Sequence, residues 1–253
     1  MILDLQDRVV FVTGSARRVG RAIALAFAEQ GANVVIHHVS PSSAEMARTA
    51  VVEAKELGVD ALVTTGNQAD PDDVARMFTE IRGYYGRVDV LVNSAALFER
   101  GDVLDIDYEA WQRVMDVNLT GPFLLTQRAA GLMIENESPG VIINIGDNGG
   151  LNGWATYAHH SVSKAGVIML TRVSALALAP HRIRVNCVVP GPVLLPLGST
   201  KEIEKRIASS LPLGRLGDPE NVAHACVFLA QNDFATGSIL RVDGGEGVKG
   251  REA

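Results

Sequence analysis

The sequence has few cysteines, few aromatic residues and no excess of basic residues, and each shortage excludes a class of protein. Cys187 and Cys226 are the only cysteines and neither has a second Cys two residues away, which argues against a disulfide framework and a cysteine-based metal site. Aromatic residues make up 5% of the chain against 47% hydrophobic residues, so a core of Ala, Val, Leu and Ile is expected. The formal net charge of −6 argues against nucleic acid or an anionic membrane as a partner.

Long hydrophobic runs are also lacking. No stretch approaches the ~20 consecutive apolar residues that a membrane span needs. Residues 1–8 contain three charged side chains and no apolar run, which differs from a secretory or mitochondrial leader. We therefore expect a soluble, cytoplasmic protein with a small-molecule substrate and without a membrane partner.

What the chain does contain is an alternation of short apolar runs, typical of strands, with longer segments of helical period. No polar linker interrupts it, and 253 residues fit one large α/β domain spanning residues 1–253. The pattern predicts a Rossmann-like, doubly wound parallel sheet of about seven strands with helices on both faces. The predicted strands are Arg8–Thr13, Asn33–His38, Asp60–Thr65, Val88–Asn93, Val141–Ile145, Arg184–Val189 and Ile239–Val242. The predicted helices are Val19–Gln30, Ser42–Leu57, Pro71–Tyr84, Tyr108–Glu135, Val162–Ala179, Thr200–Ser210 and Pro219–Ala230.

Ligands of such sheets bind at the carboxyl ends of the strands, so functional residues are expected just after strands. The segment 190–216 follows the sixth predicted strand and is rich in Gly, Pro and Ser, with a short helical piece inside it. This composition favours a flap over a site rather than a domain linker.

The first predicted strand runs directly into a glycine-containing turn and a helix, Thr13-Gly14-Ser15-Ala16-Arg17-Arg18-Val19-Gly20. In such a turn backbone N–H groups approach a pyrophosphate, which the positive end of the helix dipole stabilises. Two glycines at this spacing also occur in ordinary tight turns, so the motif alone is unspecific.

Motifs further along the chain make the pattern specific. The chain resembles the short-chain dehydrogenases/reductases over nearly its whole length, with that family's motifs in the family's order and spacing. They are the Gly14 turn, Asn93-Ser94-Ala95-Ala96, Asn118, Lys164, Asn186, Pro190-Gly191 and Pro212-Leu213-Gly214-Arg215. The resemblance implies a nicotinamide cofactor, hydride transfer to or from a carbonyl, alcohol or imine, and a homotetramer.

Four departures from the usual family pattern resemble the pteridine reductases. Arg18 replaces the second glycine of the turn, and Asp147 stands where most members have a catalytic Ser. Phe98 matches the aromatic residue on which a pterin ring stacks in that branch, and His37-His38-Val39-Ser40 resembles its sequence after the second strand. The resemblance therefore implies that Phe98 and Asp147 bind the substrate.

The end of the second strand also indicates which dinucleotide is bound. An acidic residue there accepts a hydrogen bond from the ribose 2′-hydroxyl of NAD and repels a 2′-phosphate, and this chain has none. Arg17, Arg18, Ser40 and the histidines His37 and His38 can instead supply positive charge and donors around a phosphate. Two arginines oppose the dipole at a helix start, which favours a bound anion and predicts NADP(H).

The resemblance places further residues beside the cofactor or the proton path. Asn118 is expected to anchor a water molecule linked to Lys164, which itself binds the cofactor and assists catalysis. The other expected cofactor contacts, besides Gly14, are Val19, Gly20, Asn67, Asn93, Ala95, Pro190, Gly191 and Val193.

The usual catalytic tyrosine is missing. In Tyr157-Ala158-His159-His160-Ser161-Val162-Ser163-Lys164 the position four residues before Lys164 is His160. Three interpretations stay open: His160 paired with Asp147 is the general acid, Tyr157 moves into the site, or the pocket binds cofactor without turnover.

The sequence thus predicts an NADPH-dependent reductase of a small planar or carbonyl substrate, with pteridines leading and no metal. A catalytically impaired dinucleotide-binding or regulatory member of the family is the alternative from another functional class, and a general sugar or ketone dehydrogenase is the third hypothesis.

Overall fold

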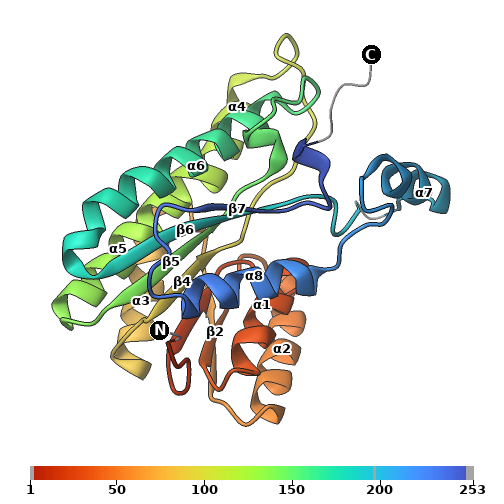
Figure 1. The fold of residues 1–253 in the computed structure, drawn as a ribbon. Helices are drawn as coiled ribbons and strands as arrows, with labels where there is room; N and C mark the ends of the chain where they lie inside the picture. The colour runs from red at the N-terminus through yellow and green to blue at the C-terminus, as the bar shows by residue number, and fades with distance from the viewer. Residues whose placement is uncertain (1–2, 196–197, 249–253) are drawn as a thin grey trace.

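One parallel sheet of seven strands, in the order β3-β2-β1-β4-β5-β6-β7, organises the computed structural model, which describes residues 3–195 and 198–248 (Figure 1). The predicted doubly wound sheet is confirmed. The observed strands lie within two residues of the predicted ones because each is a short apolar run flanked by turn residues. They are β1 Val9–Val12, β2 Asn33–His38, β3 Ala61–Thr65, β4 Val90–Asn93, β5 Gly140–Ile145, β6 Ile183–Pro190 and β7 Ile239–Val242.

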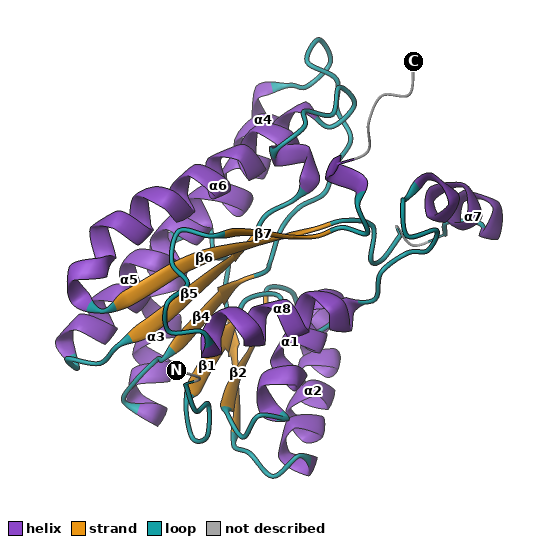
Figure 2. Cartoon of the chain, viewed as in Figure 1, coloured by secondary structure: helices purple, strands orange, loops and turns teal. Residues whose placement is uncertain are grey.

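Helices cover both faces of the sheet (Figure 2). One face carries α1, α2 and α8, and the other carries α3, α5 and α6. The helices are α1 Arg18–Ala28, α2 Ala44–Glu56, α3 Pro71–Tyr85, α4 Tyr108–Met115, α5 Gly121–Glu135, α6 Ala158–Leu178, α7 Lys201–Ser210 and α8 Pro219–Gln231.

Each strand supplies side chains to both layers of the core. In β1, Val10 and Val12 pack with α1 and α8, whereas Val9 and Phe11 pack with α3 and α5. This period of two is what a strand buried on both faces requires. Because β1 lies between β2 and β4, the strand order reverses beside it, and the carboxyl ends of β1 and β4 frame the crevice where such sheets bind ligands.

The predicted helix over Tyr108–Glu135 is interrupted. Its two parts, α4 and α5, are joined by the π-helical segment η2, Asp116–Thr120. Pro122 has no N–H group and cannot donate the α-helical hydrogen bond to the carbonyl of Asn118, which favours a wider turn at this point. Such π-helical turns occur frequently at functional sites, and this one carries the predicted site residue Asn118.

Helix α6 differs from expectation in length and hydropathy. It begins at Ala158 rather than Val162, and together with the turn η4 (Ala179–His181) it is long and apolar enough to cross a membrane by length and composition, with a mean hydropathy of 1.5. The sequence expectation that no stretch approaches a membrane span was therefore wrong. Helix α6 packs on β5 and β6, however, and a core helix meets the same criterion, so this feature gives little support for a membrane span.

Candidate active site

The turn after β1 leaves no room for side chains at its two glycines. Gly14 has a left-handed φ of 67°, and a Cβ atom there would lie 3.0 Å from Ala95. A Cβ atom at Gly20 would lie 2.5 Å from the carbonyl oxygen of Gly14, which rules out a side chain where α1 meets the turn. Backbone therefore forms the wall of the crevice here, as close approach of a ligand requires.

The amino end of α1 is free to bind an anion. No side chain of the described residues caps its first N–H groups, no acidic residue lies in its first turn, and Arg17 and Arg18 are both exposed. Arg18 adopts a left-handed φ of 55°, which costs a non-glycine residue roughly 1 kcal/mol, and its Nη2 lies 3.3 Å from the carbonyl oxygen of Leu195. Ser40 and half-buried His38 lie at the neighbouring end of β2. The donor set fits the phosphates of a dinucleotide.

His37 has a different role from the one that the sequence predicts. Its Nδ1 accepts the N–H of Gly14 at 3.0 Å, and its Nε2 lies 2.8 Å from the carbonyl oxygen of Gly66. Burial lowers the pKa of His37 from its ordinary value to about 4. The prediction that His37 supplies positive charge to a phosphate was wrong, because the buried ring is neutral near pH 7 and both nitrogens bind backbone.

Other predicted cofactor residues line the same edge of the sheet. The hydroxyl of Thr13 accepts the N–H groups of Ser94 and Ala95, each at 3.0 Å, which fixes the turn after β4 against the turn after β1. Asn67 is exposed after β3, where its side chain accepts the N–H of Ala69. Asn93 is buried and donates to Asn144 at 2.8 Å, so it links β4 to β5.

Asp147 and His160 face one another, as expected of an acid pair. Nε2 of His160 lies 3.5 Å from Oδ2 of Asp147, and His160 is only 2% exposed. Oδ1 of Asp147 accepts the N–H of Gly149 at 2.7 Å, which leaves Oδ2 to face the imidazole. Nδ1 of His160 lies 3.1 Å from the carbonyl oxygen of Leu97, so this nitrogen carries a hydrogen. Nε2 has no hydrogen-bond partner among the described residues.

Asn118 lies next to His160, and Lys164 lies close enough to Asp147 to interact with its charge. The Asn118 side chain accepts the N–H of Leu97 at 2.7 Å and donates to the Leu97 carbonyl oxygen and to Ser163. It thereby fixes the Leu97 backbone, whose carbonyl oxygen contacts Nδ1 of His160. The ammonium group of Lys164 donates to the carbonyl oxygen of Ile145 at 2.7 Å. Burial lowers the pKa of Lys164, and Asp147 opposes part of this effect. No direct hydrogen bond joins Asn118 to Lys164 in the described residues.

Two aromatic side chains lie against His160, and a third packs on them. Phe98 contacts the imidazole edge-on at a centroid distance of 4.8 Å, and Trp154 lies nearly parallel to it at 6.4 Å. Tyr157 stacks on Phe98 at 4.5 Å, so one face of the expected pterin platform is covered. Tyr157 therefore lies at the rim, without a hydrogen bond to Lys164 or Asp147 in the described part of the chain. Sequence reasoning missed Trp154, although an aromatic residue in a Gly-rich loop after a strand end is a signal for a binding role.

Two carboxylates close to the Asp147–His160 pair, those of Asp243 and Glu246, were not predicted from the sequence. Nδ2 of Asn148, in the short helix η3 (Asn148–Gly150), donates to Glu246 at 2.6 Å and to Asp243 at 3.2 Å. Glu246 belongs to η5 (Glu246–Val248), and burial raises its pKa while the Asn148 hydrogen bond opposes the rise. These residues meet only through the fold, since about a hundred residues separate Asn148 from Asp243 and Glu246, and no local pattern marks them.

The flap begins where β6 ends. A Cβ atom at Gly191 would lie 2.6 Å from the Cα of Asp243, so Pro190-Gly191 passes close to the backbone after β7. Beyond it, a cavity of about 660 Å³ lies between Arg18 and the flap, with Val193 and Leu194 on its walls. Residues 196–197 of the predicted flap lie outside the described residues.

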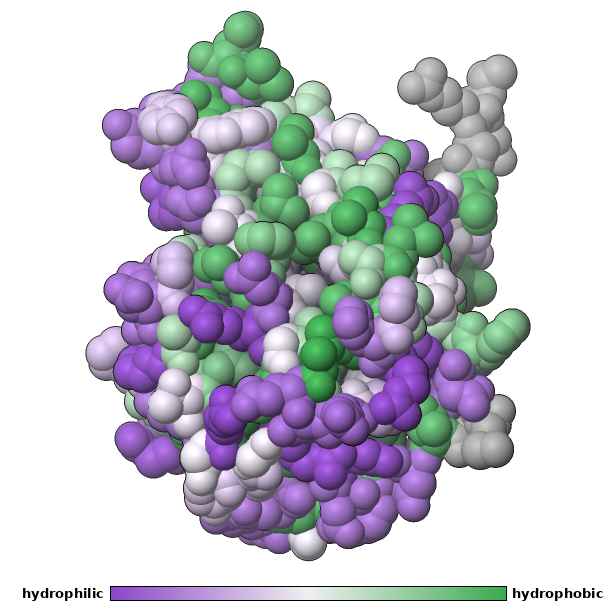
Figure 3. Space-filling view, turned by 90° about the vertical axis from the view of Figure 1, so that its left-hand side faces the viewer, coloured by the Kyte–Doolittle hydropathy of each residue, from purple (hydrophilic) through white to green (hydrophobic). Residues whose placement is uncertain are grey.

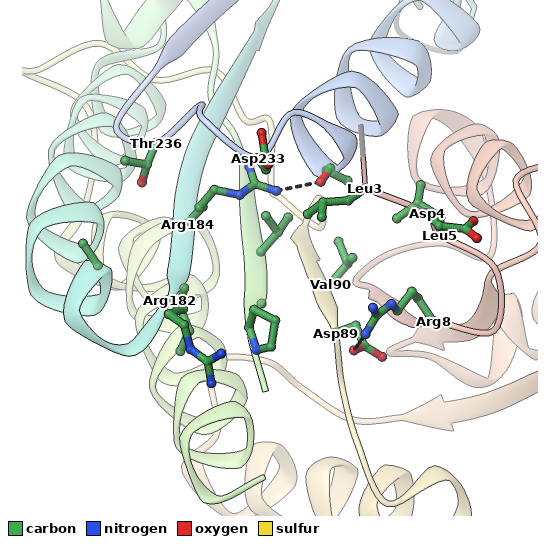
Figure 4. A pocket seen from close by; sticks show the side chains of 16 residues that line it. Leu3, Asp4, Leu5, Arg8, Asp89, Val90, Arg182, Arg184, Asp233 and Thr236 are labelled. Atoms are coloured by element: carbon green, nitrogen blue, oxygen red, sulfur yellow. Dashed lines mark hydrogen bonds and ion pairs between the residues drawn. The ribbon is translucent and has the colours of Figure 1, made fainter. Parts of the chain in front are cut away.

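A second cavity, of about 320 Å³, lies at the opposite edge of the sheet (Figure 4). Its walls include Leu3, Val90 and Ile183, and none of the predicted site residues lines it. Its central arginine, Arg184, donates to the carbonyl oxygens at the end of α8, including that of Ala230 at 2.6 Å. Within residues 3–195 and 198–248, the uncapped start of α1, the glycine turns and buried polar atoms without a hydrogen-bond partner, such as Nε2 of His160, mark the carboxyl edge as the functional one.

Comparison with known proteins shows the family to which the chain is similar. A family model described as enoyl-(acyl carrier protein) reductase matches residues 14–246. The chain is 38% identical to 3beta-hydroxysteroid dehydrogenase 1 of Eggerthella lenta, over 96% of this chain and 94% of that protein. It is 36% identical to a 3-oxoacyl-(acyl-carrier-protein) reductase of Staphylococcus aureus, over 92% of this chain and 96% of that one. A blue fluorescent protein from a metagenomic library, solved in complex with NADPH, is 32% identical and superimposes with a TM-score of 0.88 over 96% of this chain and 99% of its own.

Proposed function

The chain belongs to the short-chain dehydrogenase/reductase family of oxidoreductases, and we propose that it is an NADPH-dependent reductase of a neutral carbonyl or imine carried on a planar ring. The observation that carries the proposal is the pair of buried His160 and half-buried Asp147, close to Lys164 and bordered by aromatic side chains. Such a pair would act as a charge-balanced proton donor at the position where the family has its tyrosine.

The preference for NADPH is supported by the donors at the ends of β1 and β2. Arg17, Arg18 and Ser40 would hold the 2′-phosphate, and no acidic residue lies there to repel it. The uncapped end of α1 and the glycines of the turn would receive the pyrophosphate. When bound, NADPH supplies the hydride, and the remaining chemistry belongs to residues of this chain.

His160 is suited to hold and release one proton at Nε2. Its Nδ1–H stays on the Leu97 carbonyl oxygen in both protonation states, so the ring keeps its orientation when Nε2 gives its proton to the substrate oxygen or nitrogen. Asp147 balances the charge of the protonated ring. The proton donor in this proposal is therefore the pair, with Lys164 as the buried cation beside it.

The surroundings of the pair favour a neutral, flat substrate. Phe98, Trp154 and Tyr157 provide aromatic surface, while Asp147, Asp243 and Glu246 give this end of the site negative charge that disfavours anionic carriers. Pteridines belong to this class, as do cyclic ketones. The covered face of Phe98 favours ketones at least as much as pterins, so a general ketone dehydrogenase is the second candidate.

A substrate panel tests the proposed function. Loss of NADPH absorbance is followed with dihydrobiopterin, dihydrofolate, a cyclic ketone, a diketone and a thioester of a 3-oxo acid. Turnover of the neutral ring compounds above the thioester supports the proposal. Tight NADPH binding without turnover on any compound would instead support a dinucleotide-binding protein that no longer catalyses.

We further propose that the protein is a homotetramer. Helices α5 and α6 carry exposed apolar residues on the side away from the sheet, among them Val173 at 55% and Leu176 at 81% exposure. Hydrophobic residues gather on that face of the molecule (Figure 3). Pairing of this face about a two-fold axis would bury them. Light scattering that gives a monomer at micromolar concentration would contradict this assembly.

A further inference from the structure

His37 is a predicted cofactor residue to which the proposed chemistry gives no task. It lies at the carboxyl end of β2, and both of its ring nitrogens bind backbone groups, so it has no polar side-chain atom left for a ligand. Its polar atoms are fully used, and every partner is backbone or a neighbouring hydroxyl of the crevice.

The imidazole joins the ends of three adjacent strands. Nδ1 accepts the N–H of Gly14 in the turn after β1, and Nε2 donates to the carbonyl oxygen of Gly66 after β3. The N–H of His37 itself donates to the Ser15 hydroxyl at 2.9 Å. One side chain on β2 thereby fixes the spacing between the Gly14 turn and the loop that leads to Asn67.

The two ring contacts require one tautomer of the neutral imidazole. A backbone N–H donates to Nδ1, so Nδ1 has no hydrogen, and the hydrogen on Nε2 is given to a carbonyl oxygen. A proton on Nδ1 would set two donors against each other 3.0 Å apart. The lowered pKa of His37 agrees with this, since burial disfavours the charged ring.

We propose that neutral His37 is a positioning residue for the dinucleotide: its Nδ1 holds the Gly14 turn where the turn can receive the cofactor, and its contact with the Gly66 carbonyl oxygen fixes the tautomer of the ring. The inference rests on the proposed NADPH binding. Because the N–H of Gly14 is taken by His37, the turn's later N–H groups and the arginines are left to face the phosphates. An ordinary core histidine would stabilise the fold without acting on cofactor affinity.

Two conservative substitutions separate these roles. His37→Asn keeps an oxygen near Nδ1 that can accept the Gly14 N–H, whereas His37→Gln keeps an amide near Nε2 that can donate to Gly66. Each variant loses one hydrogen bond, so both lower the thermal unfolding midpoint by a similar amount. NADPH affinity is measured by fluorescence titration of the full-length protein, and hydrogen exchange of the peptide spanning Gly14 reports on the turn.

We expect His37→Gln to weaken NADPH binding by about tenfold, the effect of losing one positioning hydrogen bond, and His37→Asn to stay within about threefold of the native affinity. Exchange at the Gly14 turn should rise in His37→Gln only. Equal NADPH affinity in the native protein and both variants, or equal weakening that follows the loss of stability, would overturn the positioning role. A native protein that binds no dinucleotide would overturn the proposed function, and this inference with it.

Discussion

His37 and His160 are equally buried, at 2% exposure, yet the structure treats them in opposite ways. Both ring nitrogens of His37 bind backbone groups, and the ring is locked in one neutral tautomer. His160 has one nitrogen on the Leu97 carbonyl oxygen and the other, without a hydrogen-bond partner among the described residues, facing Asp147. A buried histidine with both ring nitrogens hydrogen-bonded holds its neighbours in place. A buried histidine with one ring nitrogen free of hydrogen bonds, next to a carboxylate, is placed to exchange a proton.

The largest expected effect tests the catalytic side of this contrast. His160→Ala should lower kcat by about a hundredfold or more, because general acid catalysis contributes roughly that factor. Tyr157→Phe, whose ring stays on Phe98, is the matched control and should change kcat little. Turnover is measured at saturating NADPH with the best substrate of the panel. If His160→Ala remains active and Tyr157→Phe does not, the proton comes from Tyr157.

The structural side of the contrast should be visible in the pH dependence of stability. Because the pKa of His37 is about 4 in the folded chain and about 6.5 when unfolded, the unfolded state binds the extra proton between these values. Stability should therefore fall as the pH drops from 6.5 to 4, by about 3 kcal/mol if His37 acts alone. His38 and Asp73 also face the ring, so the slope is read as the difference between the native protein and His37→Asn in urea unfolding. Parallel slopes in the two proteins would contradict the assignment.

A smaller effect is expected on the preference for NADPH over NADH, which depends on the charge of two arginines rather than on the geometry of a histidine. Replacing both arginines, Arg17→Ala with Arg18→Ala, should remove most of a preference for NADPH over NADH that we expect to be at least about tenfold. The ratio of the two dissociation constants measures this preference. Arg21→Ala is a useful control, since the Arg21 guanidinium group is held in an ion pair by Glu53 of α2. A preference that survives the double substitution would place the phosphate elsewhere.

The sequence predicts the strands, and the proximity of Asp147 and His160, because both depend on local pattern or on motif spacing. Apolar runs bounded by turn residues place all seven strands, and motif spacing is enough to suggest that Asp147 and His160 meet. The role of His37 is not predictable in this way, since it depends on how far the ends of three strands lie from one another. The same holds for Glu246, which reaches Asn148 from the other end of the fold.

The remaining differences between the predicted and observed helices lie where the helical pattern of apolar residues gives no reliable boundary. The segment Tyr108–Glu135 has a continuous helical pattern, and only Pro122 hints that the hydrogen bonding changes within it. The start of α6 was predicted too late because its first turn contains His159, His160 and Ser161, polar residues in place of the apolar ones that mark a helix.

The π-helical segment η2 also constrains how this protein can vary. It holds one more residue per turn than an α-helix, so deleting a single residue from 116–120 would allow an unbroken α-helix. Every side chain beyond the deletion would then be rotated by about 100° relative to those before it. Either Asn118 would turn away from Leu97, or Leu125 and Ala129 would leave the sheet. Helix α4 and helix α5 are thus out of phase with each other, and a change of chain length here cannot preserve the site and the core together.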